Sequence, residues 1–389
     1  MRDFLYINNS MKRILFAFLA LCAGISLWAS NYEIDGWWVY KVGAAGDNVV
    51  ITYRGSNYSD YNEYVGDLVI PATLTDGTQT YPVVGIGKEA FWACTELTSI
   101  TIPASVKSIG NIAFADCISL SSVTIKGSGL TTIGDNAFSS CMKLTEIILP
   151  TSLESIGDAA FAACYELGAI TIPGQVTYIG ERAFMYCHAL QSISVYANNP
   201  NYSSTDGVLF DKEQTTLICY PESKTSTTYT LPSTVRVIKR YAFENAKKLK
   251  TITLTDSIET INEGTFRACS SLSTITIPAS VDTIGDSAFD GCKALSSITC
   301  KAIAPPICGE RYCFGDVNKS IPVYVPAESV TVYQGAPIWH EFTNIRAIPS
   351  EGLEELQSGK RQGKKVIENG VLYIECNGRT FTTQGQEVK

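Results

Sequence analysis

The sequence predicts a solenoid of the α/β class, with a parallel β-sheet on one face, short helices or turns on the other, and a β-rich N-terminal cap. Phenylalanine recurs every 23 or 24 residues, with one longer step of 59. Cysteine usually follows three positions later, and a short alternating apolar and polar stretch precedes the next phenylalanine. A period of this length is typical of solenoids, whose repeats contact only their neighbours. The recurring residues are Phe91, Phe114, Phe138, Phe161, Phe184, Phe243, Phe266 and Phe289.

One repeat, residues 97–117, illustrates the predicted coil. Ile100 and Ile102 alternate with polar residues, as in a short strand whose apolar side chains point inward. Pro103 ends this strand, because proline cannot donate to a ladder. An extended segment follows, and the apolar residues around Phe114 have the spacing of a short helix. Strands of successive coils should therefore pair in parallel, about 4.8 Å apart.

The chain has 13 cysteines, and most of them follow the same periodicity. We interpret these as a column of buried thiols, which act as small apolar side chains, and not as a disulfide framework. Ala246 fills the same position after Phe243, and alanine can neither form a bridge nor bind a metal. Cys308 and Cys313 lie outside the column and are the pair in which we would first expect a disulfide. The column comprises Cys94, Cys117, Cys141, Cys164, Cys187, Cys269 and Cys292.

Residues 1–30 are predicted to form a secretory signal peptide. Lys12 and Arg13 precede an apolar run over residues 14–23, and small residues follow it. The run is short for a membrane anchor, since a spanning helix needs about 20 apolar residues. Cys22 raises a lipoprotein alternative, but a leucine precedes it where a small residue is expected. No other segment of the sequence is apolar enough to span a membrane.

The remaining sequence divides into segments around the repeats. Residues 31–65 carry no full repeat and are expected to form the β-rich N-terminal cap, with strands over 33–40 and 49–54. The solenoid is expected to span residues 66–348 and to close with a C-terminal cap over about 321–348, which shields the end of the core. Residues 349–365 are predicted to be a polar linker and residues 366–389 a C-terminal β-hairpin tail.

The long step between Phe184 and Phe243 equals two periods plus 13 residues. Alternating stretches at 206–210 and 215–220 predict a hairpin within an insertion over about 197–232. We therefore expect two coils here, one of which has lost its phenylalanine, with the sheet continuing across them. Insertions of this kind often lie on a binding face, and a decorated coil without a ligand is the alternative.

The composition argues against several classes of function. A net charge of −8 leaves little room for the basic face that nucleic-acid binding needs. His188 and His340 are the only histidines, and no phosphate-loop, dinucleotide-binding, zinc-protease or calcium-loop motif occurs. Cys187 next to His188 suggests a nucleophilic dyad, but adjacent helical residues do not face each other and this cysteine belongs to the buried column. We predict no catalytic residues, no cofactor, no metal site and no enzymatic activity.

Hydroxyl side chains dominate the outward positions of the predicted strands. One interpretation is β-propensity, because threonine suits a solvated strand and hydroxyls pair modestly across strands. The other is a flat hydrogen-bonding platform for a glycan or a protein. An ice-binding face is a remote third interpretation, which Glu146 and Ile148 interrupt. The candidate residues are Ser99, Thr101, Ser122, Thr124, Thr171, Thr251, Thr253, Thr274 and Thr276.

Aromatic residues in the predicted N-terminal cap form a second candidate surface. Trp37, Trp38, Tyr58 and Tyr61 could anchor a partner or stack on a sugar. The alternative is that about half of the cap aromatics cover the end of the solenoid, as a cap must do.

The repeat frame L-x-x-I-x-I-P-x-S-V-x-x-I-G-x-x-A-F-x-x-C, present over about residues 66–345, resembles the leucine-rich repeats of the Bacteroides surface protein A type. The resemblance implies a leucine-rich-repeat solenoid, export, a location at the cell surface or in the medium with outer-membrane association possible, and a role in adhesion. We predict a non-enzymatic, adhesin-like protein whose strand face binds a host or extracellular-matrix protein or a glycan. A structural scaffold or spacer without a dedicated ligand is the alternative, and the sequence indicates no oligomeric state.

Overall fold

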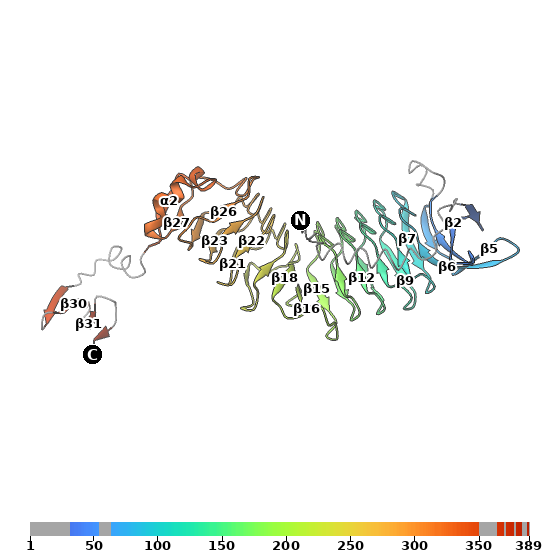
Figure 1. Ribbon diagram of the computed structural model, residues 1–389, viewed down its shortest axis with the longest axis horizontal. Coiled ribbons are helices and arrows are strands. Elements are labelled where there is room, and N and C mark those ends of the chain that lie inside the picture. Colours follow the sequence, from blue (N-terminus) through green and yellow to red (C-terminus); the bar gives the residue numbers. More distant parts are fainter. Residues whose placement is uncertain are drawn as a thin grey trace, which may run out of the picture.

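A computed structural model describes residues 32–53 and 64–349, and the backbone of the tail at 364–368, 371–376, 379–382 and 387–388. The predicted signal peptide, residues 350–363 of the predicted linker, and Tyr58 and Tyr61 lie outside the described residues. The coils stack side by side along a curved path (Figure 1), from β6 (Thr80–Ile86) near one end to α2 (Val330–Gly335) at the other.

The N-terminal strands join the solenoid directly. β1 (Tyr32–Ile34), β2 (Trp37–Val42) and β3 (Asn48–Ile51) pair antiparallel in order, and β3 then pairs in parallel with β6. The strand predicted over 33–40 is therefore wrong as one element. Asp35 and Gly36 have φ values of 54° and 79°, so they form a tight turn that divides it into β1 and β2. β5 (Thr73–Thr75) pairs antiparallel with β6 across a turn that contains Asp76 and Gly77.

Each regular coil contributes two strands, and the predicted parallel pairing of the first strand is confirmed. These first strands form the strand face, which is divided into three parallel sheets. The first sheet contains β4 (Gly66–Val69), β7 (Leu97–Ile102), β9 (Ser122–Ile125) and β11 (Glu146–Ile147), and the second contains β13 (Ala169–Ile172) and β15 (Ser192–Val195). The third contains β19 (Thr228–Thr230), β21 (Thr251–Thr253), β23 (Thr274–Ile277), β25 (Ser297–Cys300), β27 (Val323–Val325) and β28 (Ile345–Ala347).

The second strand of each regular coil has two residues, and most of these strands bury their isoleucine, as Ile109 does. Ile179 is half-buried and Ile307 is exposed. These short strands extend the sheet of β6 and form a separate sheet in the C-terminal half. They are β8 (Ser108–Ile109), β10 (Thr132–Ile133), β12 (Ser155–Ile156) and β14 (Tyr178–Ile179), and then β22 (Thr260–Ile261), β24 (Thr283–Ile284) and β26 (Ile307–Cys308).

The corner around each recurring phenylalanine consists of turns, so the short helix predicted there is wrong. Around Phe114, Ile112 and Asp116 have φ values of 61° and 60°, and positive φ interrupts a right-handed helix. Instead, Ala115 N–H donates to Ile112 O within the coil, at 3.1 Å. Phe114 N–H donates to Ala137 O of the next coil, at 2.7 Å. Half of the corner amides are thus satisfied by a neighbouring coil.

Stacked rings and buried thiols fill the core. Phe91, Phe114, Phe138, Phe161 and Phe184 follow one another with ring centroids 4.9 to 6.0 Å apart and nearly parallel planes. The predicted column of buried, free cysteines is confirmed. Six of these thiols donate to a main-chain carbonyl oxygen of the preceding coil. The acceptor is in each case the oxygen of the recurring phenylalanine, at 3.0 to 3.2 Å. The thiol is therefore a packed side chain that also links coils.

The insertion folds as an antiparallel meander of β16 (Tyr202–Thr205), β17 (Val208–Asp211) and β18 (Thr216–Cys219). The predicted hairpin corresponds to β17 and β18, and β18 pairs in parallel with β20 (Val237–Ile238). Tyr220 occupies the place of the missing phenylalanine. Its N–H donates to Ala242 O at 2.8 Å, and its ring lies 4.9 Å from that of Phe243.

The strand face does not continue across this insertion, which corrects the prediction of a continuous sheet. β15 pairs with β13 but not with β19, because the meander occupies its other side and Ile193 N–H donates to Gly207 O at 2.9 Å. The buried apolar residues also separate into two clusters there. We call the contact between the coil of Phe184 and the coil of Tyr220 the joint.

The C-terminal end carries one coil that the sequence analysis missed. Phe314 continues the stack at 5.2 Å from Phe289, and Trp339 and Phe342 cover it at 5.3 Å each. The covering segment contains 3-10 helix η2 (Ala327–Ser329), α2 and 3-10 helix η3 (Trp339–Glu341). Trp339 is fully buried, so it closes the core.

The tail forms a four-stranded antiparallel sheet instead of the predicted hairpin. Its strands are β29 (Lys364–Glu368), β30 (Val371–Cys376), β31 (Arg379–Thr382) and β32 (Glu387–Val388). The predicted hairpin corresponds to β30 and β31. β29 begins before the predicted end of the linker because residues 364–368 pair with β30.

Candidate functional site

The outward hydroxyls of the strand face lie in register on neighbouring strands. Ser99 pairs with Ser122, and Thr101 with Thr124. In the C-terminal half, Thr251 pairs with Thr274. We call Ser99, Thr101, Ser122 and Thr124 the N-terminal hydroxyl patch, and Thr251, Thr253, Thr274 and Thr276 the C-terminal hydroxyl patch.

All the predicted hydroxyl residues are accessible. Ser99 and Thr101 are half-buried, and the others, including Thr171, are exposed. Because paired strands lie about 4.8 Å apart, adjacent hydroxyls can donate to and accept from one extended ligand. The joint separates the two patches, so the structure does not bring all nine residues together. Ile148, 81% exposed, interrupts the hydroxyl positions before Thr171.

Asp67 is a charged residue of this surface that the sequence did not predict to take part in binding. Ser99 Oγ and Thr98 Oγ1 donate to Asp67 Oδ1 at 2.7 and 2.8 Å. These two bonds, that of Ser99 first, hold the pKa of Asp67 below its usual range. The carboxylate thus remains available beside the N-terminal hydroxyl patch as an acceptor. Its place beside Ser99 depends on the pairing of β4 with β7, so its position relative to the patch could be inferred only once that register was known.

The two cap tryptophans that the structure describes are half-buried. Trp37 stacks on Tyr64 at 5.7 Å, and Tyr64 lies 4.9 Å from Phe91. Trp37 therefore covers the end of the phenylalanine stack, as the alternative to partner binding predicted for about half of the cap aromatics. Trp38 lies beside it in β2.

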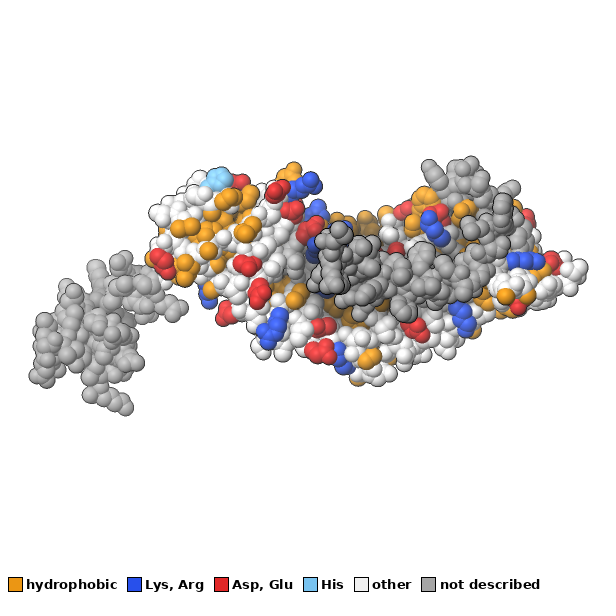
Figure 2. Space-filling model, viewed as in Figure 1, with side chains coloured by type: hydrophobic (Ala, Val, Ile, Leu, Met, Phe, Trp, Pro, Cys, Tyr) orange, Lys and Arg blue, Asp and Glu red, His pale blue; other side chains and the backbone are white. Residues whose placement is uncertain are grey.

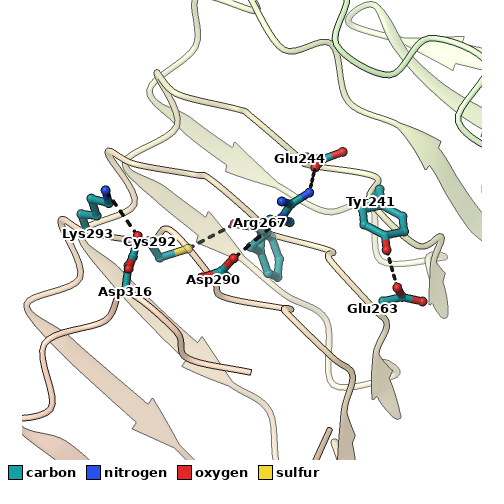
Figure 3. Close-up of polar contacts among 9 residues, drawn as sticks. Tyr241, Glu244, Glu263, Arg267, Asp290, Cys292, Lys293 and Asp316 are labelled. Carbon is teal, nitrogen blue, oxygen red and sulfur yellow. Dashed lines mark hydrogen bonds and ion pairs between the residues drawn. The ribbon is translucent and has the colours of Figure 1, made fainter. Parts of the chain in front are cut away.

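Charged residues of the corners form short ion-pair chains in the C-terminal half (Figure 3). Arg267 lies between Glu244 and Asp290, at 2.9 and 3.7 Å. Lys293 contacts Asp316 at 3.3 Å. On the face seen in Figure 2, charges of both signs are scattered among uncharged and apolar side chains. Such an arrangement gives little long-range steering to a charged ligand.

The geometry around Cys187 does not support nucleophilic chemistry. Its Sγ donates to Phe161 O at 3.1 Å, and burial raises the pKa of the thiol well above its usual value. His188 Nδ1 instead lies 2.7 Å from Glu222 Oε2. Among the described residues, no three His, Cys, Asp or Glu side chains are grouped as metal ligands, and no helix is long and apolar enough to cross a membrane.

Comparison with known families assigns the repeats. The family model for the BspA type Leucine rich repeat region matches residues 84–205 and 218–330, in six copies. The chain belongs to this family. The unmatched residues 206–217 fall in the meander, so the BspA-type repeat is interrupted in sequence and in structure at the same place. No curated protein sequence matches the chain.

Solved structures share the BspA-type fold of this chain. A leucine-rich repeat protein from Bacteroides ovatus is 27% identical, with a TM-score of 0.57 over 82% of this chain and 77% of that one. One from Eubacterium ventriosum is 24% identical, with a TM-score of 0.61 over 83% and 85%. The pneumococcal vaccine antigen PcpA is 21% identical, with a TM-score of 0.58 over 84% and 100%.

Proposed function

We propose that this protein is an exported, non-enzymatic, adhesin-like surface protein that binds a protein or glycan through its N-terminal hydroxyl patch. The observation that carries the proposal is the in-register row of accessible hydroxyls on β7 and β9. Asp67 adds one acceptor of fixed geometry at the edge of this row. A glycan or a polar peptide offers the alternating donors and acceptors that such a row can pair.

Two further observations support an interaction role. A solenoid presents an extended surface instead of a central pocket, and the family of this chain is built on that architecture. One structural neighbour is described as a vaccine antigen, which is consistent with exposure on a cell. Export and surface display of the present chain are part of the proposal.

The test is a binding screen of the purified chain against immobilised extracellular-matrix proteins and a glycan array. A quadruple alanine variant of the N-terminal hydroxyl patch should weaken the binding found by about tenfold or more, since several hydrogen bonds of about 1 kcal/mol each would be lost. The same change in the C-terminal hydroxyl patch is the matched control and should leave affinity unchanged. Both variants alter accessible side chains, so stability should change little.

Two outcomes would contradict the proposal. Unchanged binding in the N-terminal variant would exclude this patch as the contact surface. Failure of the chain to bind any probe, together with its display on intact cells, would favour the spacer interpretation instead.

A further inference from the structure

A ladder of main-chain hydrogen bonds connects the corners of successive coils. In most regular coils three N–H groups, two residues before the phenylalanine, at it and two residues after it, donate to the next coil, and the coil of Phe289 retains the first two. In the coil of Phe161 these donors are Ala159, Phe161 and Ala163, with acceptors at 2.8 to 2.9 Å. The same pattern holds in the coils of Phe114, Phe138, Phe243 and Phe266.

The joint breaks this ladder. Among the described residues, neither Arg182 N–H nor Phe184 N–H has a hydrogen-bond acceptor, although both occupy donor positions. The third donor, Tyr186 N–H, pairs with Glu222 Oε1 at 2.7 Å instead of with a main-chain oxygen. One carboxylate therefore replaces one rung, and two rungs lack a protein acceptor. Phe184 is buried, whereas Arg182 is exposed, and a buried amide without a partner is rare because leaving it unpaired is costly.

A cavity of about 50 Å³ lies at this break. Its lining includes Arg182 and Phe184 on one side and Tyr220 and Glu244 on the other. Within the part of the chain that the structure describes, Tyr220 Oη and Glu244 Oε2 are buried without a hydrogen-bond partner, and these residues are only 2% and 4% exposed. Two orphan main-chain donors and two orphan side-chain atoms thus belong to residues that line one cavity.

The charges around the cavity select its occupant. Arg182 and Arg240 would repel a cation, and Glu222 and Glu244 would repel an anion. Arg182 lies over the ring of Tyr241, 4.0 Å from its centroid, and Arg240 contacts Glu263 at 3.5 Å. A neutral molecule that both donates and accepts suits this balanced set. The volume excludes anything larger than a few water molecules, since each needs about 10–15 Å³ by this measure.

We propose that the joint is a hydrated hinge, in which roughly three or four ordered waters replace the missing rungs between Arg182, Phe184, Tyr220 and Glu244. Water-mediated bonds are nearly as favourable as direct ones but exchange with solvent. The two core clusters separate next to this cavity, within the coil of Tyr220, and the pairing of β13 with β15 is the strand contact that still crosses the joint. Local opening of the solenoid therefore begins at the joint, and the two halves move relative to each other there.

The first test is a crystal structure of the full chain at a resolution that shows water. We expect water oxygens within hydrogen-bond distance of Arg182 N or Phe184 N, linked to Tyr220 Oη or Glu244 Oε2. An ion in this density, or direct closure of the two coils with no water between them, would overturn the proposal.

The second test is amide hydrogen exchange, with the preceding coil as an internal control. Arg182 and Phe184 should exchange about tenfold or more faster than Ala159 and Phe161, which occupy the same positions and donate to Glu181 O and Ala183 O. Tyr220→Phe removes one predicted water partner and should raise exchange at Phe184 by a further factor of two or more, with no change at Phe161. Equal protection at the two coils, or a Tyr220→Phe effect that spreads evenly over both, would contradict a hinge at the joint.

Discussion

The contact between the coils of Phe138 and Phe161 and the contact at the joint join similar coils in different ways. In the first, the rings stack 5.5 Å apart, Cys164 Sγ donates to Phe138 O, and the strands and corners pair directly. At the joint, among the described residues, Phe184 and Tyr220 make no ring contact with each other and β14 does not pair with β18, although β13 still pairs with β15. Each regular contact thus combines several weak interactions, whereas the joint retains only some of them. Substitutions at a regular contact and at the joint should therefore differ in their effect on the free energy of unfolding.

The largest expected effect comes from removing a ring within the regular stack. Phe138→Ala should lower the free energy of unfolding by about 3–5 kcal/mol, because it leaves a cavity between two rings. Phe184→Ala should cost about 1 kcal/mol less, since Phe184 stacks on one side only, at 6.0 Å. Urea unfolding of both variants measures this. Equal costs would mean that the joint packs as tightly as a regular contact.

The next effect concerns the thiol column. Cys141→Ala should cost about 1 kcal/mol, from a lost hydrogen bond to Phe114 O and a small cavity. Cys141→Ser is the matched control, because a hydroxyl retains the donor, and it should cost less than alanine does. The chain has Ala246 at this position in the coil that follows the joint, so alanine is compatible with the coil. A larger loss for serine than for alanine would show that apolar packing, and not the hydrogen bond, explains the cysteine.

Two buried tyrosines provide a smaller, paired test. Tyr333 Oη donates to Ala302 O at 2.8 Å, so Tyr333→Phe should cost about 1 kcal/mol. Tyr220 Oη has no partner among the described residues, so Tyr220→Phe should cost only about a few tenths of a kcal/mol. Thermal and urea unfolding of the two variants gives the comparison. A cost at Tyr220 equal to that at Tyr333 would mean that its hydroxyl is bonded as firmly as one with a protein partner.

The regular coils could be predicted from the sequence because the residues that determine them are close together in the chain and recur in every repeat. Ile100 and Ile102 alternate with polar residues, and Cys117 recurs at a fixed distance from Phe114. The corner was harder to predict. Ile112 and Asp116 have positive φ, although neither is a glycine, the residue that usually indicates such a conformation. Hydrogen bonds with neighbouring coils stabilise this backbone.

The joint was predicted only in part. The alternating stretches predict the hairpin. Tyr220 lies 23 residues before Phe243, and this spacing could have identified it as the residue that replaces the missing phenylalanine. The candidate hydroxyls could be placed from strand alternation alone. The orphan atoms of Tyr220 and Glu244 could not, because they depend on how two coils meet across an insertion.

A still smaller change in stability is expected from the titration of Glu244, whose carboxyl group lines the cavity at the joint. Burial raises the pKa of the Glu244 carboxyl, and Arg267 opposes the shift. A raised carboxyl pKa means that the folded state holds the proton more tightly, so this stabilising contribution is present at acidic pH. It is lost as pH rises from the ordinary glutamate value, about 4.3, through the raised pKa. The unfolding free energy of the wild type should therefore fall relative to Glu244→Gln as pH rises from 4.5 to about 7, as urea midpoints would show.

Asp76 supplies a control of opposite sign far from the joint. Hydrogen bonds from Thr78, Tyr81 and Gln79 lower the pKa of its carboxyl, so its contribution is present above the ordinary aspartate pKa and is lost as pH falls below it. The stability of the wild type relative to Asp76→Asn should thus decline on acidification below about 3.9, whereas relative to Glu244→Gln it should improve as pH falls toward 4.5. A difference between wild type and Glu244→Gln that stays constant across this range would mean that water solvates the Glu244 carboxylate fully. The cavity would then be an open part of the surface instead of a buried joint.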